Sequence, residues 1–243
     1  MPDPITLYAI PYAGGHSLVY RNLKQYLYPS VTLKTLELSG RGSRAREPLI
    51  RDVEEIAQDL LGKIRGDITE GSYALFGHSM GSLLAYLLCR SIAEEGLPLP
   101  RQLFCSGHAA PASRKKDPSF AQAKYSLSAD DFWEYIDSLG ALPPEVKDHE
   151  ELMSYFEPIL RADIQALECF EYRPVNRPLD VPIAVFYGID DRDTPLHSLL
   201  PWQIESRSTV SYFPFEGGHF GLFEQLPEFS QILNRFLGFS AGL

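Results

Sequence analysis

A serine lies between two glycines in the run Gly77-His78-Ser79-Met80-Gly81. This run matches the pattern G-x-S-x-G, in which the glycines allow a sharp turn between a strand and a helix. The apolar segment Tyr73 to Phe76 precedes the run, and a segment of helical periodicity, Ser82 to Arg90, follows it. Such a turn holds the serine hydroxyl above the sheet, so we predict that Ser79 is a nucleophile.

A serine hydroxyl attacks well only when a neighbouring base takes its proton, and a third group must orient that base. His219 is the favoured base, because it follows two glycines in a loop after the last predicted strand. His78 is a poor candidate, because it adjoins Ser79 on the strained turn and its ring is expected to point away. Weaker candidates remain open, namely His16, His108, His149 and His197.

The acid that orients the base is expected after the predicted strand Ile183 to Tyr187, because this fold supplies serine, acid and histidine in that chain order. Three aspartates lie there: Asp190, Asp191 and Asp193. We favour Asp191 from its spacing between the end of the strand and Pro195, with Asp190 as the alternative. Asp193 fits equally well as a cap of the helix that begins near Pro195.

Acyl transfer also requires N–H donors for the oxyanion that develops on the carbonyl. Met80, the residue after the nucleophile, supplies the first backbone N–H. We assign the second to Ala13, in the run Pro11-Tyr12-Ala13-Gly14-Gly15 directly after the first predicted strand. The sequence contains no metal-ligand cluster, Walker-type loop or dinucleotide fingerprint, so we expect a serine hydrolase without a metal or cofactor.

Short apolar segments rich in β-branched or aromatic residues alternate with stretches of helical periodicity, which predicts a parallel sheet flanked by helices. These segments are Ile5 to Ile10, Thr32 to Leu36, Tyr73 to Phe76, Gln102 to Cys105, Ile183 to Tyr187 and Val210 to Phe213. Together with the serine turn they predict the α/β-hydrolase fold. At 243 residues and 44% hydrophobic residues, we expect a single domain over residues 1–243.

The alternation breaks between about Pro111 and Pro178, where helical patterns dominate, including Ala129 to Leu139 and Glu150 to Phe170. We interpret residues 111–178 as a helical insertion in the domain, or lid. Its large side chains are candidates to line an acyl-binding channel, although a plain structural subdomain is an equally good interpretation. They are Phe120, Tyr125, Phe132, Trp133, Tyr135, Met153, Tyr155, Phe156 and Phe170.

The formal net charge of −10 argues against nucleic acid or an anionic membrane as the main partner. The basic run Arg114-Lys115-Lys116, with Arg41, Arg44 and Arg46, forms either a local positive patch or ordinary solvated surface charge. The three cysteines are too few and too widely spaced for a disulfide framework or a zinc site.

The first residues, Met1 to Pro4, lack the basic region of a signal peptide, and the apolar stretch behind them is only as long as a strand. We therefore expect a cytoplasmic protein with no signal peptide and no membrane anchor.

Taken together, these residues resemble the stand-alone type II thioesterases that accompany nonribosomal peptide and polyketide synthases. The resemblance is carried by Pro11 to Gly15, Gly40-Arg41-Gly42-Ser43-Arg44 with Glu47-Pro48, Gly77 to Gly81, Gly188 to Asp191, and Gly217 to Phe220. The Gly-Arg-Gly block discriminates best, since general esterases share the serine turn.

The chain departs from the family pattern at Ser39, usually proline, and at His16, usually a small residue. We hypothesise that His16 narrows or polarises the entrance beside the oxyanion loop.

The resemblance implies hydrolysis of acyl or aminoacyl thioesters on the phosphopantetheine arm of an acyl or peptidyl carrier protein, which edits mischarged or stalled synthases. Phosphopantetheine then enters only as part of the substrate. We expect a monomer with no nucleic-acid or membrane partner. The run Arg114 to Lys116 is a candidate to meet the phosphate or an acidic carrier surface.

Three alternatives remain open at the level of the sequence. The first is a small-molecule carboxylesterase or lipase with the same triad. The second is a catalytically inactive α/β-hydrolase used as a binding module, because fold does not imply function. The third is a chain-terminating thioesterase that cyclises its product, which the free-standing length disfavours.

Overall fold

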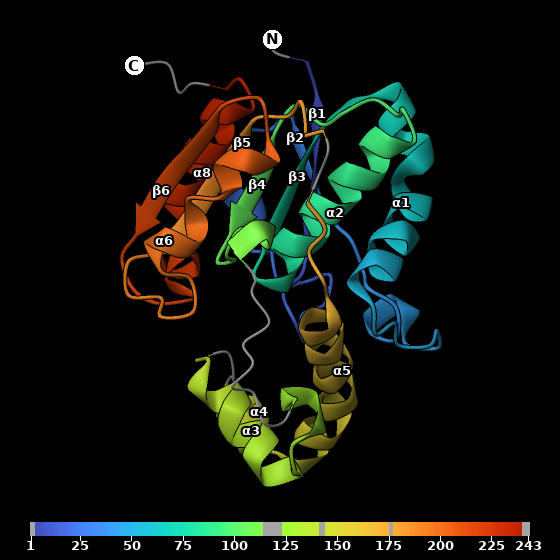
Figure 1. Ribbon diagram of the computed structural model, residues 1–243, viewed down its shortest axis with the longest axis vertical. Helices are drawn as coiled ribbons and strands as arrows, with labels where there is room; N and C mark the ends of the chain where they lie inside the picture. Colours follow the sequence, from blue (N-terminus) through green and yellow to red (C-terminus); the bar gives the residue numbers. More distant parts are fainter. Residues whose placement is uncertain (1–2, 114–122, 141–143, 175–176, 240–243) are drawn as a thin grey trace.

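The computed structural model describes residues 3–113, 123–140, 144–174 and 177–239. Its centre is a sheet of six strands in the order β2-β1-β3-β4-β5-β6, in which every neighbouring pair is parallel (Figure 1). The strands are β1 (Ile5–Ile10), β2 (Val31–Thr35), β3 (Ser72–His78), β4 (Leu103–Ser106), β5 (Ile183–Gly188) and β6 (Val210–Phe215). The predicted α/β fold with a parallel sheet is confirmed.

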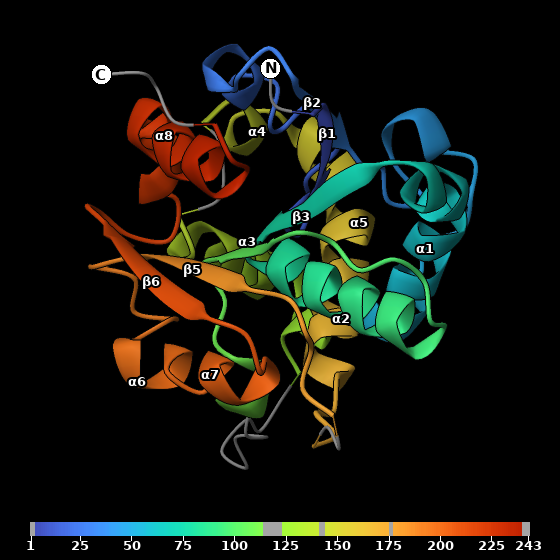
Figure 2. The same ribbon diagram turned by 90° about the horizontal axis from the view of Figure 1, so that it is seen from above.

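Each face of the sheet is covered by its own apolar cluster. One cluster contains the buried faces of α1 (Val53–Glu70) and α2 (Met80–Glu94). The other contains α8 (Leu226–Phe236) and the 3-10 helix η1 (Leu23–Tyr26), and Figure 2 shows α8 and α2 on opposite sides of the sheet. Alternate residues of β1 enter the two clusters, because successive side chains of a strand point to opposite faces.

The helices between β4 and β5 form a second group beyond the ends of the strands (Figure 1). They are α3 (Ala129–Ser138), α4 (Pro144–Lys147) and α5 (Glu150–Cys169). α3 and α5 share a small core of Phe132, Trp133, Ile136, Leu160 and Ile164. Ala166, further along α5, belongs to the main cluster, so this helix also packs against the body of the domain.

The remaining elements are short. They are η2 (Gly42–Arg44), η3 (Pro111–Ser113), η4 (Lys124–Ser126), α6 (Leu196–Leu199), α7 (Trp202–Glu205) and η5 (Gly221–Glu224). None of the helices in the described ranges has the length and apolar character that crossing a bilayer requires. Cys89 and Cys105 are buried free thiols, and Cys169 is an exposed one.

Candidate active site

The loops that carry the predicted site residues meet at one edge of the sheet. The loop 11–15 follows β1, Ser79 follows β3, Asp191 follows β5 and His219 follows β6. Because all the strands are parallel, their carboxyl ends lie together, and this edge is where open α/β sheets bind their ligands.

Ser79 occupies a strained turn between β3 and α2. Its φ of 53° makes it the only non-glycine residue with positive φ in the part of the chain that the structure describes. Its N–H donates to the carbonyl of Ser106 at 2.7 Å, which anchors the turn to the neighbouring strand β4. A Cβ on Gly77 would collide with the carbonyl of Gly81, and a Cβ on Gly81 would collide with the carbonyl of Ile10. The turn therefore requires both glycines.

Asp191 and His219 form a hydrogen bond between Oδ2 and Nδ1 at 2.8 Å. The Asp191 side chain is 2% exposed. It also accepts the Thr194 hydroxyl at 2.7 Å and the Asp193 N–H at 3.0 Å. Burial alone would raise the pKa of Asp191, but His219 and these two other donors outweigh burial and lower the pKa to about 2. Asp191 is therefore a carboxylate at neutral pH, aimed at His219.

The two other aspartates of this loop have exposed side chains. Asp190 contributes its backbone N–H, which donates to the Gly217 carbonyl at 3.0 Å and ties the two loops together. Gly188 allows this close approach, because a Cβ there would collide with the carbonyl of Gly218. Asp193 lines the pocket described below, but its side chain has no hydrogen bond to a described residue.

The His78 ring packs against the His219 ring and does not line the pocket that Ser79 and His219 share. The His78 ring is fully buried, 5.0 Å from the His219 ring between centroids, and its Nδ1 is within hydrogen-bond distance of the Ser106 hydroxyl at 3.0 Å. Burial and the nearby His219 lower the pKa of His78 well below its usual value. Gly107, with φ of 59°, packs against both rings, and a Cβ there would lie 2.6 Å from His78 and 3.3 Å from His219.

The other histidines are spread over the molecule. His108 lines the pocket, with Nδ1 within 2.7 Å of the Ala109 carbonyl. His149 and His197 are exposed near the starts of α5 and α6. His16 is absent from the pocket lining, and its Nδ1 accepts the N–H of Leu18 at 3.3 Å.

Ser79 and His219 open into a pocket of about 680 Å³. No hydrogen bond joins their side chains, although both residues are described, and such bonds often form only when substrate is bound. Aliphatic residues of α3, its C-cap and α5 line much of the pocket: Ile136, Leu139, Leu160, Ile164 and Leu167. Of the described aromatic residues expected to line an acyl channel, only Tyr135 does so, and Phe132 and Trp133 are core residues of the helical group instead.

The two backbone donors assigned to the oxyanion lie beside this pocket. Ala13 lines it, and Met80 is the first residue of α2, where a helix leaves its N–H groups without intrahelical partners. Neither N–H donates a hydrogen bond to another residue that the structure describes. Both groups thus meet the chemical requirement of an oxyanion donor.

The interpretation of Arg41 as surface charge is wrong. Arg41 and Asp163 form a bidentate ion pair with distances of 2.6 and 2.7 Å, and their side chains are 4% and 0% exposed. Sequence reasoning missed Asp163, which lies on α5 between the pocket residues Leu160 and Ile164. A charged residue at an apolar position of a helix was the available signal, because buried charges are normally paired.

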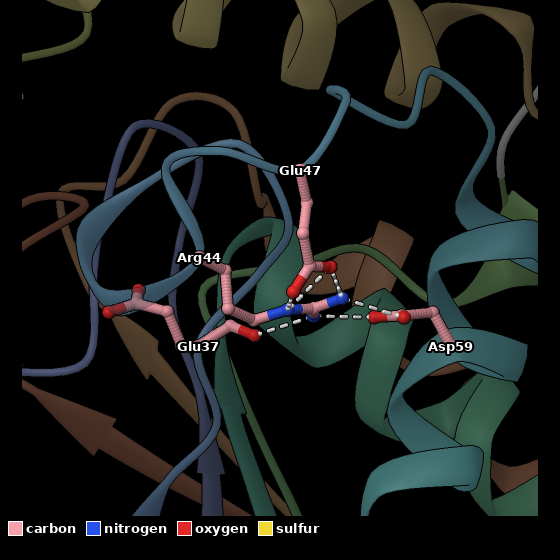
Figure 3. Close-up of polar contacts among 4 residues, drawn as sticks. All are labelled: Glu37, Arg44, Glu47 and Asp59. Carbon is pink, nitrogen blue, oxygen red and sulfur yellow. Dashed lines mark hydrogen bonds and ion pairs between the residues drawn. The ribbon is translucent and has the colours of Figure 1, made fainter.

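Arg44 is also paired, so it does not form a free positive patch (Figure 3). It donates to Asp59 of α1 at 2.6 and 2.8 Å, to the carbonyl of Glu37 at 3.0 Å, and to Glu47. Arg46 is exposed. The run 114–116, the rest of the predicted patch, lies outside the described residues.

Known proteins resemble this chain over nearly its whole length. A model of the thioesterase domain family matches residues 5–237. Gramicidin S biosynthesis protein GrsT of Aneurinibacillus migulanus is 28% identical over 229 residues, which cover 94% of this chain and 87% of GrsT. Among solved structures, ClbQ from the colibactin NRPS/PKS pathway matches with a TM-score of 0.90 and 31% identity, covering 97% of this chain and 98% of ClbQ.

YbtT, the type II thioesterase from the yersiniabactin NRPS/PKS pathway, matches with a TM-score of 0.84 and 27% identity, covering 97% of this chain and 94% of YbtT. The family match includes every loop of the site described above. The chain therefore belongs to the thioesterase domain family, a family of serine hydrolases, and type II thioesterases of NRPS/PKS pathways are among its relatives.

Proposed function

We propose that this thioesterase hydrolyses acyl or aminoacyl groups from the phosphopantetheine arm of a carrier protein, with Ser79, His219 and Asp191 as its catalytic triad. The observation that carries the proposal is the hydrogen bond of 2.8 Å between His219 Nδ1 and a buried carboxylate, beside a pocket that both His219 and Ser79 line. A carboxylate at Nδ1 leaves Nε2 of the neutral ring as the base.

The first half of the reaction forms an acyl-enzyme. Ser79 Oγ attacks the thioester carbonyl while Nε2 of His219 takes its proton, and Asp191 stabilises the imidazolium that results. The N–H groups of Ala13 and Met80 bind the oxyanion. The C–S bond then breaks, and His219 returns the proton to the departing thiolate.

The second half repeats these steps with water as the nucleophile. His219 takes a proton from the water while a C–O bond to the water oxygen forms. The bond to Ser79 Oγ then breaks and His219 returns the proton to Oγ, which releases a carboxylic acid and restores the serine hydroxyl. Every group in this scheme comes from the chain itself. Phosphopantetheine enters only as part of the substrate.

The partner and the substrate follow from the chemistry of the pocket and from the relatives. The wall contributed by α3 and α5 is mainly apolar, which suits an acyl chain. GrsT, ClbQ and YbtT are each named for pathways that build peptides or polyketides. An acyl or peptidyl carrier protein of such a synthase is the proposed partner, and a monomer that acts in the cytoplasm suffices for this role.

The test is release of an acyl group from a carrier protein. A carrier loaded with a short acyl group is incubated with the wild-type protein or with Ser79→Ala, and the intact mass of the carrier is followed. Release by the wild-type protein and its loss in Ser79→Ala are expected. Simple esters cleaved by the wild-type protein, with the acyl carrier left intact, would instead favour a small-molecule esterase.

A further inference from the structure

Asp163 of α5 accepts hydrogen bonds from two separate segments of the site. One is the Arg41 guanidinium, which donates to both carboxylate oxygens at 2.6 and 2.7 Å. The other is the backbone of Gly14, whose N–H donates to Oδ2 at 2.8 Å. Gly14 directly follows Ala13, the proposed oxyanion donor. A buried charge 149 positions away along the chain is therefore hydrogen-bonded to the oxyanion loop.

We propose that Asp163 is a positioning residue for catalysis, which holds the loop 12–15 so that the Ala13 N–H points at the oxyanion. The inference rests on the proposed function, because it takes Ala13 as a donor. Asp163 acts through Gly14 and touches no reacting atom. The carboxylate gives this loop a charged acceptor, and charge-assisted hydrogen bonds are stronger than neutral ones.

The glycines of the loop form a tight turn next to the contact with Asp163. Gly14 has a φ of 75°, a left-handed conformation that glycine adopts without strain. Gly15 closes a tight turn by donating to the Tyr12 carbonyl at 2.9 Å, and its own carbonyl accepts Arg41 at 3.4 Å. The Arg41–Asp163 pair thus binds the loop on both sides of the Gly14–Gly15 peptide.

Stability alone does not explain this ion pair. A buried ion pair is often no more stabilising than two apolar side chains of similar volume, because both charges lose their hydration. Nε of Arg41 is buried and has no hydrogen-bond partner in the described part of the chain, which adds to the cost of burial. An apolar pair would lack one property that Asp163 supplies, an acceptor for the Gly14 N–H.

The same helix also forms the wall of the pocket. Leu160 and Ile164 flank Asp163 on α5 and line the pocket. A Cβ on Gly14 would lie 2.6 Å from Leu160, so this helix packs directly against the loop. The acyl-binding wall and the oxyanion loop are therefore held by one face of α5.

The experiment compares two double variants with the wild-type protein. Arg41→Met/Asp163→Leu removes both charges together, so that neither is left buried alone, and it removes the acceptor for Gly14. Arg41→Gln/Asp163→Asn keeps a neutral acceptor at the same place. The readouts are kcat and KM for a soluble acyl thioester, and the affinities for two analogues. A trifluoromethyl ketone forms an oxyanion with Ser79, and a thioether lacks the carbonyl.

A matched control comes from the same block of sequence. Arg44 and Asp59 form a second bidentate pair, which joins the block to α1 (Figure 3). Neither side chain forms a hydrogen bond with the described loop 12–15. Arg44→Gln/Asp59→Asn is expected to lower stability and to leave kcat and both affinities unchanged. The control separates the loss of an Arg–Asp pair from the loss of the loop restraint.

We expect the Arg41→Met/Asp163→Leu protein (the Met/Leu variant) to fold. Its kcat should fall about 10- to 100-fold with little change in KM, and its affinity for the trifluoromethyl ketone should fall by the same factor. The affinity of the Met/Leu variant for the thioether should stay the same. The Arg41→Gln/Asp163→Asn protein (the Gln/Asn variant) should keep most of the wild-type kcat. If the Met/Leu variant does not fold, the Gln/Asn variant decides, with an expected loss of about threefold in kcat and in ketone affinity but none in thioether affinity.

Wild-type kcat in a folded Met/Leu variant, or an equal loss for the ketone and the thioether, would overturn the positioning role. If only the Gln/Asn variant folds, wild-type kcat and wild-type ketone affinity in that variant would also overturn the positioning role. Failure of the proposed function looks different. If Ser79 were not a nucleophile, the wild-type protein would neither cleave the thioester nor bind the ketone covalently. If the protein were a small-molecule esterase, it would bind the ketone and cleave simple esters but leave the acyl carrier intact.

Discussion

His219 Nδ1 lies 2.8 Å from Asp191 Oδ2, although the two residues are 28 positions apart and follow different strands. In the proposed mechanism this contact orients the imidazole. Asp191→Asn should therefore lower kcat by about 10³- to 10⁴-fold with little effect on KM, because an amide favours the wrong tautomer of the ring. Steady-state hydrolysis of an acyl thioester measures both constants.

The neighbouring aspartates provide the controls for that substitution. Asp190→Asn and Asp193→Asn change exposed side chains of the same loop and should keep kcat within about threefold of wild type. A large loss in Asp190→Asn with a small one in Asp191→Asn would reverse the assignment.

The low pKa of Asp191 also predicts a dependence of stability on pH. The folded-state pKa is about 2, against 3.8 for the ordinary side chain. A lowered carboxyl pKa stabilises the fold above the unfolded-state value, and this contribution, about 2 kcal/mol here, is lost as pH falls through the folded-state value. The gap in unfolding free energy between the wild-type protein and Asp191→Asn, from urea titrations, should shrink by about 1 kcal/mol between pH 6 and pH 3. A gap that stays constant would contradict this prediction.

Glycine-to-alanine substitutions should have opposite effects at two places. Gly62 lies on the exposed side of α1 with open space around it, so Gly62→Ala should stabilise the fold by about 0.5–1 kcal/mol. Gly77→Ala should destabilise it by about 3 kcal/mol or more, because the new Cβ meets the backbone of Gly81. Thermal or urea unfolding measures both. A Gly77→Ala protein as stable as wild type would show that the turn can relax.

The pocket wall predicts a change in acyl-chain preference. Leu139 is half-buried and lines the pocket, so Leu139→Trp fills space that a longer acyl chain would occupy. The ratio of kcat/KM for octanoyl over acetyl thioesters should fall about tenfold or more, since each excluded methylene loses about 0.8 kcal/mol of burial. Leu152→Trp, an exposed position of α5, is the control and should leave the ratio unchanged. An unchanged ratio in Leu139→Trp would place the acyl chain elsewhere.

Much of the fold was predictable from local patterns. The predicted strand Tyr73 to Phe76 is the centre of β3, which runs on through His78 to the serine turn. The helix predicted over Ser82 to Arg90 is the interior of α2, and the one over Glu150 to Phe170 differs from α5 by a single residue. The ends of α2 were predicted less well, because the observed helix runs from Met80 to Glu94 and extends beyond the predicted segment on both sides.

The sequence by itself determined the order of strands and helices and the glycines of the serine turn, because these depend on residues within a few positions of one another. It left three aspartates open as the acid, and only the tertiary structure brings Asp191 to His219. It also left Arg41 as an apparent surface charge, and the structure pairs it with Asp163, 122 positions away. Local periodicity contains no information about such distant partners, because the packing of the helices against the sheet decides which buried charges form a pair.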